Sequence, residues 1–473
     1  MLVFLSDLHF VDGTAGAHNL PLEAFKILFA DLQAQIKDPQ KNIQEIKFVL
    51  LGDIIDLLRS ERWLADDCPL AERPWGDAGA KDVPTPHPQS PTEKRCLEIL
   101  LGEPQWGPLQ PGPLSPAALS QQTKPAGLKP QTILGQNWET FYYFRNFKDI
   151  YQIELPVEII YVPGNHDRLV NLYPSLRDAL GRILGAHAIS GWYEHHFQDP
   201  DYGVFARHGH QFDLWNYGGG SDLTRTGQLQ IPIGDVFTTE FAVKIPWLFQ
   251  KLYGQTYPEM AANLRDIDNV RPLSAILEWI YYRLKVSGGA KKALDEVFDR
   301  VIKDLLDLDF VQKWRSPATK WDEVLRTLSS NWLRWLPKSI VDLIQGEDLL
   351  GMFLGVSEFL DRPEEDPLVK AAYYEQIWSA DPRYNLILYG HTHAPLHLPL
   401  DVVDGKREVA YINTGTWRPR IKRTVTWDRA HDFVEYKHMT YVLCYRPEED
   451  TRNKQTGTPS FEIWTGAKYK KYR

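Results

Sequence analysis

Short apolar runs that end in polar clusters constrain the fold of this chain more than any other feature. Three of them lie in its first half, at Leu2–Leu5, Lys47–Leu51 and Val157–Val162. Runs of this length that are rich in Val, Ile and Leu fit buried strands better than helices. Between them lie Pro21–Ile36 and Asn137–Tyr151, where apolar residues recur at the three- and four-residue spacing of a helix. This alternation predicts a layered α/β fold, in which ligands bind just past the carboxyl ends of the strands.

Strand-like runs return near the end of the chain. They lie at Leu386–Tyr389, Glu408–Asn413, Phe433–Cys444 and Phe461–Thr465. We expect these four runs to complete a second sheet. The sequence shows no internal repeat, so the second sheet is not predicted to be a copy of the first.

Two long insertions interrupt the strand and helix pattern of this 473-residue chain. Residues 61–136 are rich in Pro and Gly and are predicted to form a surface excursion with one short helix near Glu93–Leu101. Residues 214–381 are predicted to form a helical cap. The main domain would then consist of residues 1–213 and 382–473. Amphipathic helical patterns in the cap lie at Phe237–Leu252, Leu273–Val286, Ala293–Trp314 and Trp332–Phe359.

Composition narrows the class of protein. The net charge of -9 argues against a general nucleic-acid binder, because such proteins hold phosphate backbones with clustered Lys and Arg. Three cysteines without CxxC spacing predict neither a disulfide framework nor a thiolate metal site. No apolar stretch approaches the roughly 20 residues that span a bilayer, and the first residues lack the features of a signal peptide. These features predict a soluble, cytoplasmic protein.

Five clusters of Asp, Asn and His follow or close the predicted strands. Taken singly, each has an ordinary explanation, such as a helix cap, a tight turn or a packed histidine pair. Turn chemistry alone does not explain why all five consist of side chains that bind metals. The clusters are Asp7-Leu8-His9, Gly52-Asp53-Ile54-Ile55-Asp56, Gly164-Asn165-His166-Asp167, His208-Gly209-His210 and Gly390-His391-Thr392-His393.

This set of side chains suits the hydrolysis of phosphate esters. The reaction needs a strong nucleophile at neutral pH and positive charge near the ester oxygens. Two divalent ions about 3.5 to 4 Å apart supply both. Carboxylates, imidazoles and one amide can hold such a pair without cancelling all of its charge. Ligands of this kind without thiolate suit Mn²⁺, Fe, Zn²⁺ or Ni²⁺.

In their order along the chain, the five clusters resemble the signature blocks of the calcineurin-like metallophosphoesterases. The resemblance spans Asp7 to His393 and covers neither insertion. It implies a two-sheet α/β sandwich flanked by helices, with two divalent ions at one edge of the sheets. It also implies that Asp53 bridges the ions, which would be held by Asp7, His9, Asp53 and His393 on one side and by Asn165, His208 and His391 on the other.

The resemblance also implies roles around the ions. His166 would lie over the substrate phosphate and stabilise the transition state or protonate the leaving group, with Asn165 beside the substrate. Asp167 and Asp56 would orient their neighbours. His210 is a predicted orienting residue or substrate contact. Asn413 is interpreted as structural.

The implied activity is hydrolysis of a phosphate ester or pyrophosphate by a metal-activated hydroxide. Two alternatives stay open, a scaffold without activity and a nuclease. The complete ligand set disfavours the scaffold, and the acidic charge balance disfavours the nuclease. Aromatic residues in the cap indicate a helical core or, alternatively, a slot for a lipid-linked or nucleoside-linked phosphate. Peripheral membrane contact through the cap is suggested by Trp332, Arg334, Trp335 and Lys338, although ordinary packing explains these residues nearly as well.

Overall fold

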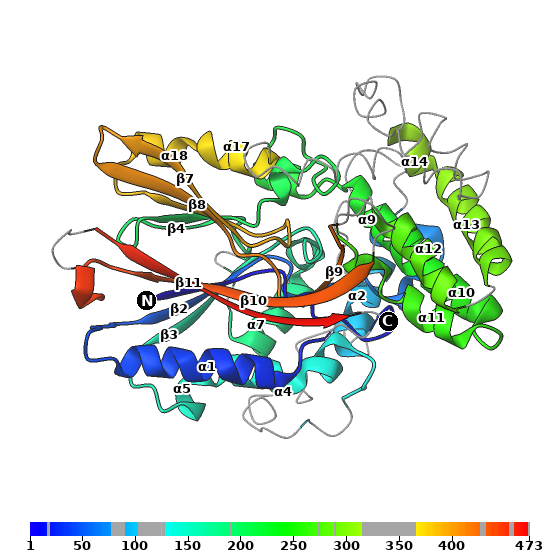
Figure 1. Ribbon diagram of the computed structural model, residues 1–473, viewed down its shortest axis with the longest axis horizontal. Helices are drawn as coiled ribbons and strands as arrows, with labels where there is room; N and C mark the ends of the chain where they lie inside the picture. The colour runs from blue at the N-terminus through cyan, green and yellow to red at the C-terminus, as the bar shows by residue number, and fades with distance from the viewer. Residues whose placement is uncertain are drawn as a thin grey trace.

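Two β-sheets face each other in this protein, with helices on both outer sides and a further group of helices at one end (Figure 1). The sheets are both mixed, so the chain is an α/β protein, as the alternation of strands and helices predicts. The computed structural model describes residues 1–16, 19–76, 90–102, 124, 128–186, 188, 191–271, 275–287, 290–314, 366–425, 432–453 and 458–471.

The first sheet has the strand order β11-β10-β1-β2-β3, with β9 paired to β10. Strands β1, β2 and β3 run parallel, and β10 runs antiparallel to β1. The strand bounds are β1 (Leu2–Leu5), β2 (Ile46–Leu51), β3 (Val157–Val162), β9 (Pro419–Arg423), β10 (Phe433–Tyr445) and β11 (Ser460–Lys471).

The assignment of the last two predicted strands to a second sheet is wrong. Strands β10 and β11 exist, but they extend the first sheet, with Leu2 opposite Cys444 and Phe4 opposite Val442. An apolar run indicates that a strand is buried, whereas its pairing partner depends on contacts distant in sequence.

The second sheet has the order β4-β5-β6-β8-β7. Its three central strands β5, β6 and β8 run parallel, and both edge strands are antiparallel to their neighbours. The bounds are β4 (Phe197–Asp199), β5 (Val204–Ala206), β6 (Leu386–Tyr389), β7 (Leu396–Val403) and β8 (Arg407–Asn413).

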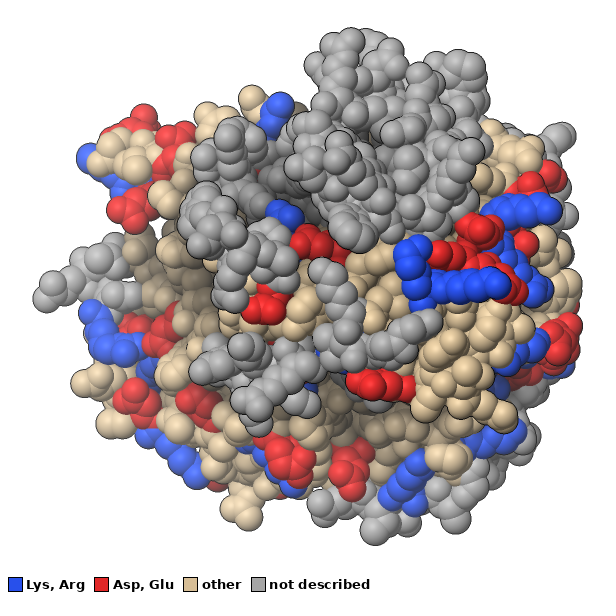
Figure 2. All heavy atoms as spheres, turned by 45° about the vertical axis from the view of Figure 1, so that its right-hand side comes forward, with Lys and Arg blue, Asp and Glu red and all other residues tan. Residues whose placement is uncertain are grey.

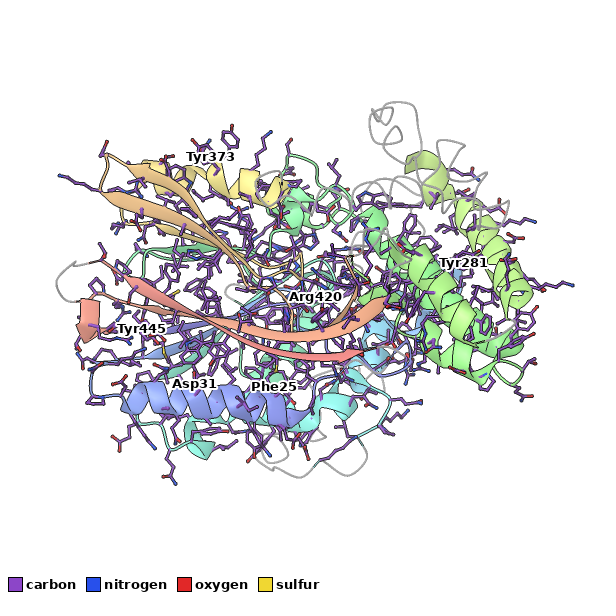
Figure 3. All side chains as sticks on the ribbon, in the orientation of Figure 1. Phe25, Asp31, Tyr281, Tyr373, Arg420 and Tyr445 are labelled. Atoms are coloured by element: carbon purple, nitrogen blue, oxygen red, sulfur yellow. The ribbon has the colours of Figure 1, made fainter. Side chains whose placement is uncertain are left out.

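Apolar side chains fill the space between the sheets and the space under the helices. Between the sheets, Phe4 and Leu51 of the first share a buried cluster with Leu388 of the second. On the outer face of the first sheet, Phe25 of α1 stacks on Trp417 with ring centroids 5.0 Å apart (Figure 3). Helices α1 (Leu22–Lys37), α2 (Pro91–Leu101), α4 (Ile133–Arg145), α5 (Phe147–Ile150), α6 (Leu169–Leu172) and α7 (Pro174–Leu184) cover this face, and α17 (Pro367–Tyr373) and α18 (Gln376–Ala380) pack on the second sheet.

Residues 233–314, here called the helical segment, form the group of helices at one end of the molecule (Figure 1). Its apolar core includes Phe237, Trp279 and Phe298. The helices match three of the four predicted patterns, and the fourth, Trp332–Phe359, lies outside the described residues. The elements are α9 (Ile233–Phe237), the π-helical turn Thr238–Val243, α10 (Lys244–Tyr253), α11 (Pro258–Leu264), the 3₁₀ turn Ile267–Asn269, α12 (Ile276–Ser287), α13 (Lys291–Leu306) and α14 (Asp309–Trp314).

Buried polar contacts fix the helical segment against the sheets. Arg168, next to the Gly164 cluster, donates from Nε to Asp235 Oδ2 of α9 at 3.0 Å, and both side chains are buried. The backbone N–H of Arg271 donates to the carbonyl oxygen of Ile421 in β9 at 2.9 Å. Among the described helices, none is both long and apolar enough to cross a bilayer.

Candidate metal centre

The five polar clusters meet at one edge of the two sheets. Asp7 and Asp53 follow β1 and β2, His166 follows β3, and His208 and His391 follow β5 and β6. Because parallel strands end at the same edge, residues distant in sequence converge there. Side chains that could hold a metal ion form three groups in the described part of the chain: Asp7, His9, Asp53 and His393; Asp53, His208 and His391; and His9, Asp56 and His166.

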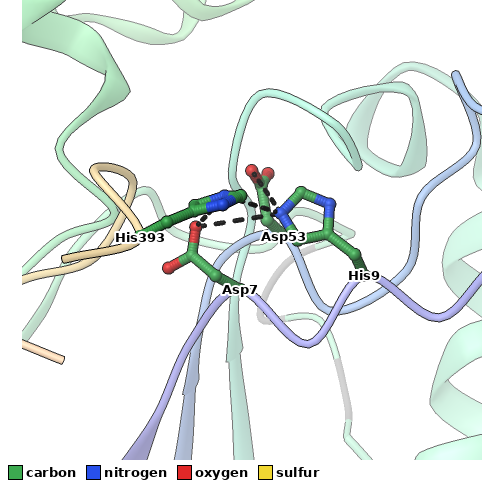
Figure 4. A group of neighbouring side chains, drawn as sticks. All are labelled: Asp7, His9, Asp53 and His393. Atoms are coloured by element: carbon green, nitrogen blue, oxygen red, sulfur yellow. Dashed lines mark hydrogen bonds and ion pairs between the residues drawn. The ribbon is translucent and has the colours of Figure 1, made fainter. Parts of the chain in front are cut away.

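In the first group, two carboxylates and two imidazoles point toward one another, with their ligand atoms within 4.8 Å of one another (Figure 4). His393 Nε2 lies 3.3 Å from Asp7 Oδ1 and 3.1 Å from His9 Nε2. His9 Nε2 lies 3.6 Å from Asp53 Oδ2. Burial lowers the pKa of His9 to about 4, so its imidazole stays neutral as a metal ligand requires.

The second group shares Asp53 with the first. His208 Nε2 lies 3.3 Å from Asp53 Oδ2, and His208 Nδ1 lies 2.9 Å from the carbonyl oxygen of Leu51. A hydrogen bond to that carbonyl keeps a proton on Nδ1. Burial alone would lower the pKa of His208, but the carboxylates of Asp53 and Asp7 raise it to about 10, so a cation at Nε2 would displace a proton that faces Asp53. His391 contacts Asp213 through Nε2, at 2.8 Å from Oδ2, so its Nδ1 is the nitrogen left for a ligand bond. One carboxylate therefore lies between two sets of ligands.

Buried ligand atoms at the site lack hydrogen bonds, as the ligands of a metal ion would when the ion is absent. Among the described residues, Asn165 Oδ1 is buried without a hydrogen-bond partner, and Asp7 Oδ1 and His208 Nε2 make no hydrogen bond but lie 3.3 Å from His393 Nε2 and Asp53 Oδ2, respectively. A buried polar atom left in that state costs about 1–3 kcal/mol, which a bound cation would offset. Burial, with the charge of Asp53 adding to it, raises the pKa of Asp7 to about 6. A cation would relieve this crowding of negative charge.

Backbone strain is concentrated at the same residues. Asp7, His9, Asp53, His391 and His393 have φ between 47° and 72°. This left-handed region costs a residue with a side chain roughly 1–2 kcal/mol. Only two other non-glycine residues of the described chain have positive φ. Strained backbone gathered at one place marks a functional site more often than a purely structural one.

Two glycines allow the clusters to approach each other. A Cβ on Gly52, which has φ 83°, would lie 2.3 Å from His208 Nδ1. A Cβ on Gly164 would lie 2.2 Å from Asp53 Oδ1. Both distances are far below van der Waals contact, so these glycines let the imidazole and the carboxylate reach the site.

His166 lies beside the metal ligands and remains partly open to solvent. Its Nδ1 is 3.0 Å from Asp56 Oδ1, and its side chain is 16% exposed. Asp56 also contacts His9 Nδ1 at 2.9 Å through Oδ2, so one carboxylate orients both imidazoles. Burial alone would lower the pKa of His166, but the carboxylates of Asp56 and Asp53 outweigh burial and raise it to about 9.

Asp167 and Asn165 fix the loop that carries His166. Asp167 accepts hydrogen bonds from the backbone N–H of Ile54 at 3.0 Å and from the Tyr161 hydroxyl. Asn165 donates from Nδ2 to Asn216 Oδ1 at 3.1 Å, and its own Oδ1 is buried without a hydrogen-bond partner among the described residues. Asp167 therefore holds the loop against the end of β2 and has no surface for a substrate, since it is fully buried.

His210 was predicted to be an orienting residue or a substrate contact. It is only 3% exposed, and its ring centroid is 5.3 Å from that of His208. Its burial favours the orienting role over contact with a substrate. Asn413 donates from Nδ2 to the carbonyl oxygen of Gly390 at 2.6 Å and so braces the His391 turn, in keeping with its interpretation as structural.

Several residues at the site carried no sequence signal for it. Asp213 comes from the loop after β5, and Arg271 reaches the site from the helical segment, where its Nη2 lies 3.3 Å from His393 Nδ1. Nearby, Asp268 forms ion pairs with Arg59 and Arg418. Single charged residues in loops are too common to be singled out without the fold.

Asp213→Asn is expected to weaken binding of the second metal ion by about 10–100-fold, the usual effect of removing a carboxylate that orients a ligand imidazole. The His391 ring would lose the charged partner that fixes its tautomer. Metal affinity is measured by competition with a chromogenic chelator, and Asp178→Asn on the exposed face of α7 is the control. Equal metal affinity in Asp213→Asn and the wild type would show that Asp213 does not support the ligand.

Comparison with known proteins gives no family for this chain: neither a protein-family model nor a curated protein sequence matches it.

Proposed function

We propose that this protein is a dinuclear-metal phosphoesterase of the calcineurin-like class. The observation that carries the proposal is the pair of buried ligand groups that share Asp53, with His166 next to both. A single structural ion would need one group of four ligands and no shared carboxylate. Two groups around one carboxylate suit a pair of ions, and the partly exposed imidazole suits a catalytic role.

In this proposal, different residues bind the metal ions and contact the substrate. Asp7, His9, Asp53 and His393 hold one ion, and Asp53, Asn165, His208 and His391 hold the other. When bound, such ions acidify a water molecule and neutralise the charge of the phosphoryl oxygens. His166 presents Nε2 to the substrate, because Asp56 contacts Nδ1, and donates a proton or hydrogen bond to the phosphoryl or leaving-group oxygen.

The helical segment acts as a cap in this proposal. Its support is the contact of Arg271 Nη2 with Nδ1 of the candidate ligand His393, at 3.3 Å. The aromatic residues Phe237, Phe241 and Trp279 are buried in the core of the segment, which favours the helical-core interpretation for them. Residues 332–338, on which the idea of membrane contact rests, lie outside the described residues, and the cytoplasmic location stays a prediction.

Neither alternative gains support from the site. A scaffold without activity would be expected to lack ligands or His166, whereas the His and Asp residues of both groups and His166 are all present in the sequence and lie near one another. A nuclease would be expected to carry a continuous basic surface. On the face shown in Figure 2, the described Lys and Arg side chains are interspersed with Asp and Glu.

A paired assay tests the proposal. We expect the purified protein with added Mn²⁺ to hydrolyse an aryl phosphomonoester or its methyl diester, to lose this activity to a chelator and to regain it with metal. Elemental analysis of the dialysed protein is expected to find close to two ions per chain. Absence of both bound metal and ester hydrolysis under these conditions would refute the proposed function.

A further inference from the structure

Three arginines surround one aspartate beside the candidate metal centre. Arg59 Nε lies 2.6 Å from Asp268 Oδ2, and Arg418 Nη2 lies 3.2 Å from the same oxygen. Arg271 donates from Nη1 to the backbone carbonyl oxygen of Asp268 at 2.8 Å. Burial alone would raise the pKa of Asp268, but these three guanidinium groups hold it well below its usual value. Asp268 therefore stays charged and offsets part of their positive charge, and the carboxylates of Asp7 and Asp56 act on Arg271 and Arg418 as well.

The three arginines are held in fixed positions, and one of them contacts a candidate metal ligand. Arg59 and Arg418 are 2% and 1% exposed, and Arg59 Nη1 and Arg418 Nε are buried without a hydrogen-bond acceptor among the described residues. Arg271 is half-buried and is the member that approaches the metal ligands. The hydrogen bond from its backbone N–H to Ile421 ties it to β9. The buried donors of Arg59 and Arg418 lack acceptors, and the guanidinium group of Arg271 is held in place. Such an arrangement suits the binding of an anion.

The contact between Arg271 and His393 changes when His393 serves as a ligand. His393 Nε2 faces Asp7 and His9, at 3.3 Å from Asp7 Oδ1, so it is the nitrogen for a ligand bond. A neutral imidazole bound through Nε2 carries its proton on Nδ1. That N–H cannot accept a hydrogen bond from Arg271 Nη2, which lies 3.3 Å away. The guanidinium then needs another acceptor, and a substrate oxygen at the centre supplies one.

We propose that Arg271 binds the charged oxygens of the substrate's phosphoryl group, and that Arg59 and Arg418 hold it in place through Asp268. Three guanidinium groups gather here around one aspartate, so the cluster favours a phosphoryl group with two negative charges over the singly charged phosphate of a diester. The substrate class is a phosphomonoester or the terminal phosphoryl group of a diphosphate. This inference rests on the proposed function, because it takes the metal centre as the place of reaction.

Arg271→Ala tests this role with two readouts. Titration calorimetry of the Mn²⁺-loaded protein with inorganic phosphate is expected to show about 10–100-fold weaker binding, as for the loss of a charged hydrogen bond. The ratio of kcat/KM for an aryl phosphomonoester to that for its methyl diester is expected to fall about tenfold. Arg271→Lys is expected to recover part of both losses, because it restores the charge without the fork of donors.

Arg423→Ala is the matched control. Arg423 lies on β9, two residues from Ile421, and its side chain is 41% exposed and paired to Glu278. The control removes the same charge and is expected to bind phosphate like the wild type. Arg271→Gln, which keeps a donor for the backbone carbonyls, repeats the test if the alanine variant unfolds.

The outcomes separate this inference from the proposed function. Wild-type phosphate affinity in Arg271→Ala, or an equal loss on monoester and diester, would overturn the role of Arg271 while the phosphoesterase proposal stands. Failure of the proposed function would appear in the wild type itself, as the absence of hydrolysis of both esters. In that case the difference in phosphate affinity between Arg271→Ala and Arg423→Ala still decides whether Arg271 binds the anion.

Discussion

Asp53→Asn is expected to lower kcat/KM by at least about 10³-fold, equivalent to about 4 kcal/mol of transition-state stabilisation, and to leave at most one tightly bound ion per chain. Asp53 Oδ2 lies 3.3 Å from His208 Nε2 and 3.6 Å from His9 Nε2, between both ligand groups. A carboxamide has one oxygen and no charge, so it cannot serve both groups. Activity is measured on the aryl phosphomonoester, and metal content by elemental analysis.

The asparagine variant is expected to fold, which makes the test informative. The backbone N–H of His166 donates to Asp53 Oδ1 at 2.8 Å, and the carbonyl oxygen of Asn can accept this bond. Asp404→Asn is the control, because Asp404 is exposed and also has positive φ, 53°. If Asp53→Asn retained two ions and turned over substrate like the wild type, Asp53 would not bridge the ions.

The strands that position the site could be predicted from the sequence because they are mostly apolar. The bounds of β1, β3 and β6 equal the predicted ones: β1 and β6 are unbroken, buried apolar runs, and β3 is apolar except for the exposed Glu158. Strand β7 gave no such signal, because it is an edge strand whose exposed residues include Asp401. Strands β4 and β5 have three residues each, too few for a periodic pattern.

The candidate ligands were predictable for a related reason. Asp7, Asp53 and His391 follow their strands within two residues, so the strand pattern alone brings them to one edge. Arg271 and Asp213 were not predictable, because loops carry them and contacts between distant elements fix their positions. Arg271 depends on the pairing of Val270 with Ile421, two residues from separate parts of the chain. No local pattern encodes such a pairing.

His166→Ala is expected to lower kcat by about 10²–10⁴-fold, the range for loss of a general acid, while both ions stay bound. His166 is absent from both ligand groups that share Asp53, so metal content should equal that of the wild type. His397→Ala, at an exposed position of β7, is the control.

The leaving group decides which role His166 has. If its imidazole protonates the leaving oxygen, esters of acidic phenols need less help, so the loss in His166→Ala should shrink as the leaving-group pKa falls. If it only binds the phosphoryl oxygens, the loss should be the same for every ester. Unchanged turnover of every ester in His166→Ala would show that His166 has no catalytic role. A loss of metal content in proportion to activity would instead make it a support of His9 through Asp56, which contacts both imidazoles.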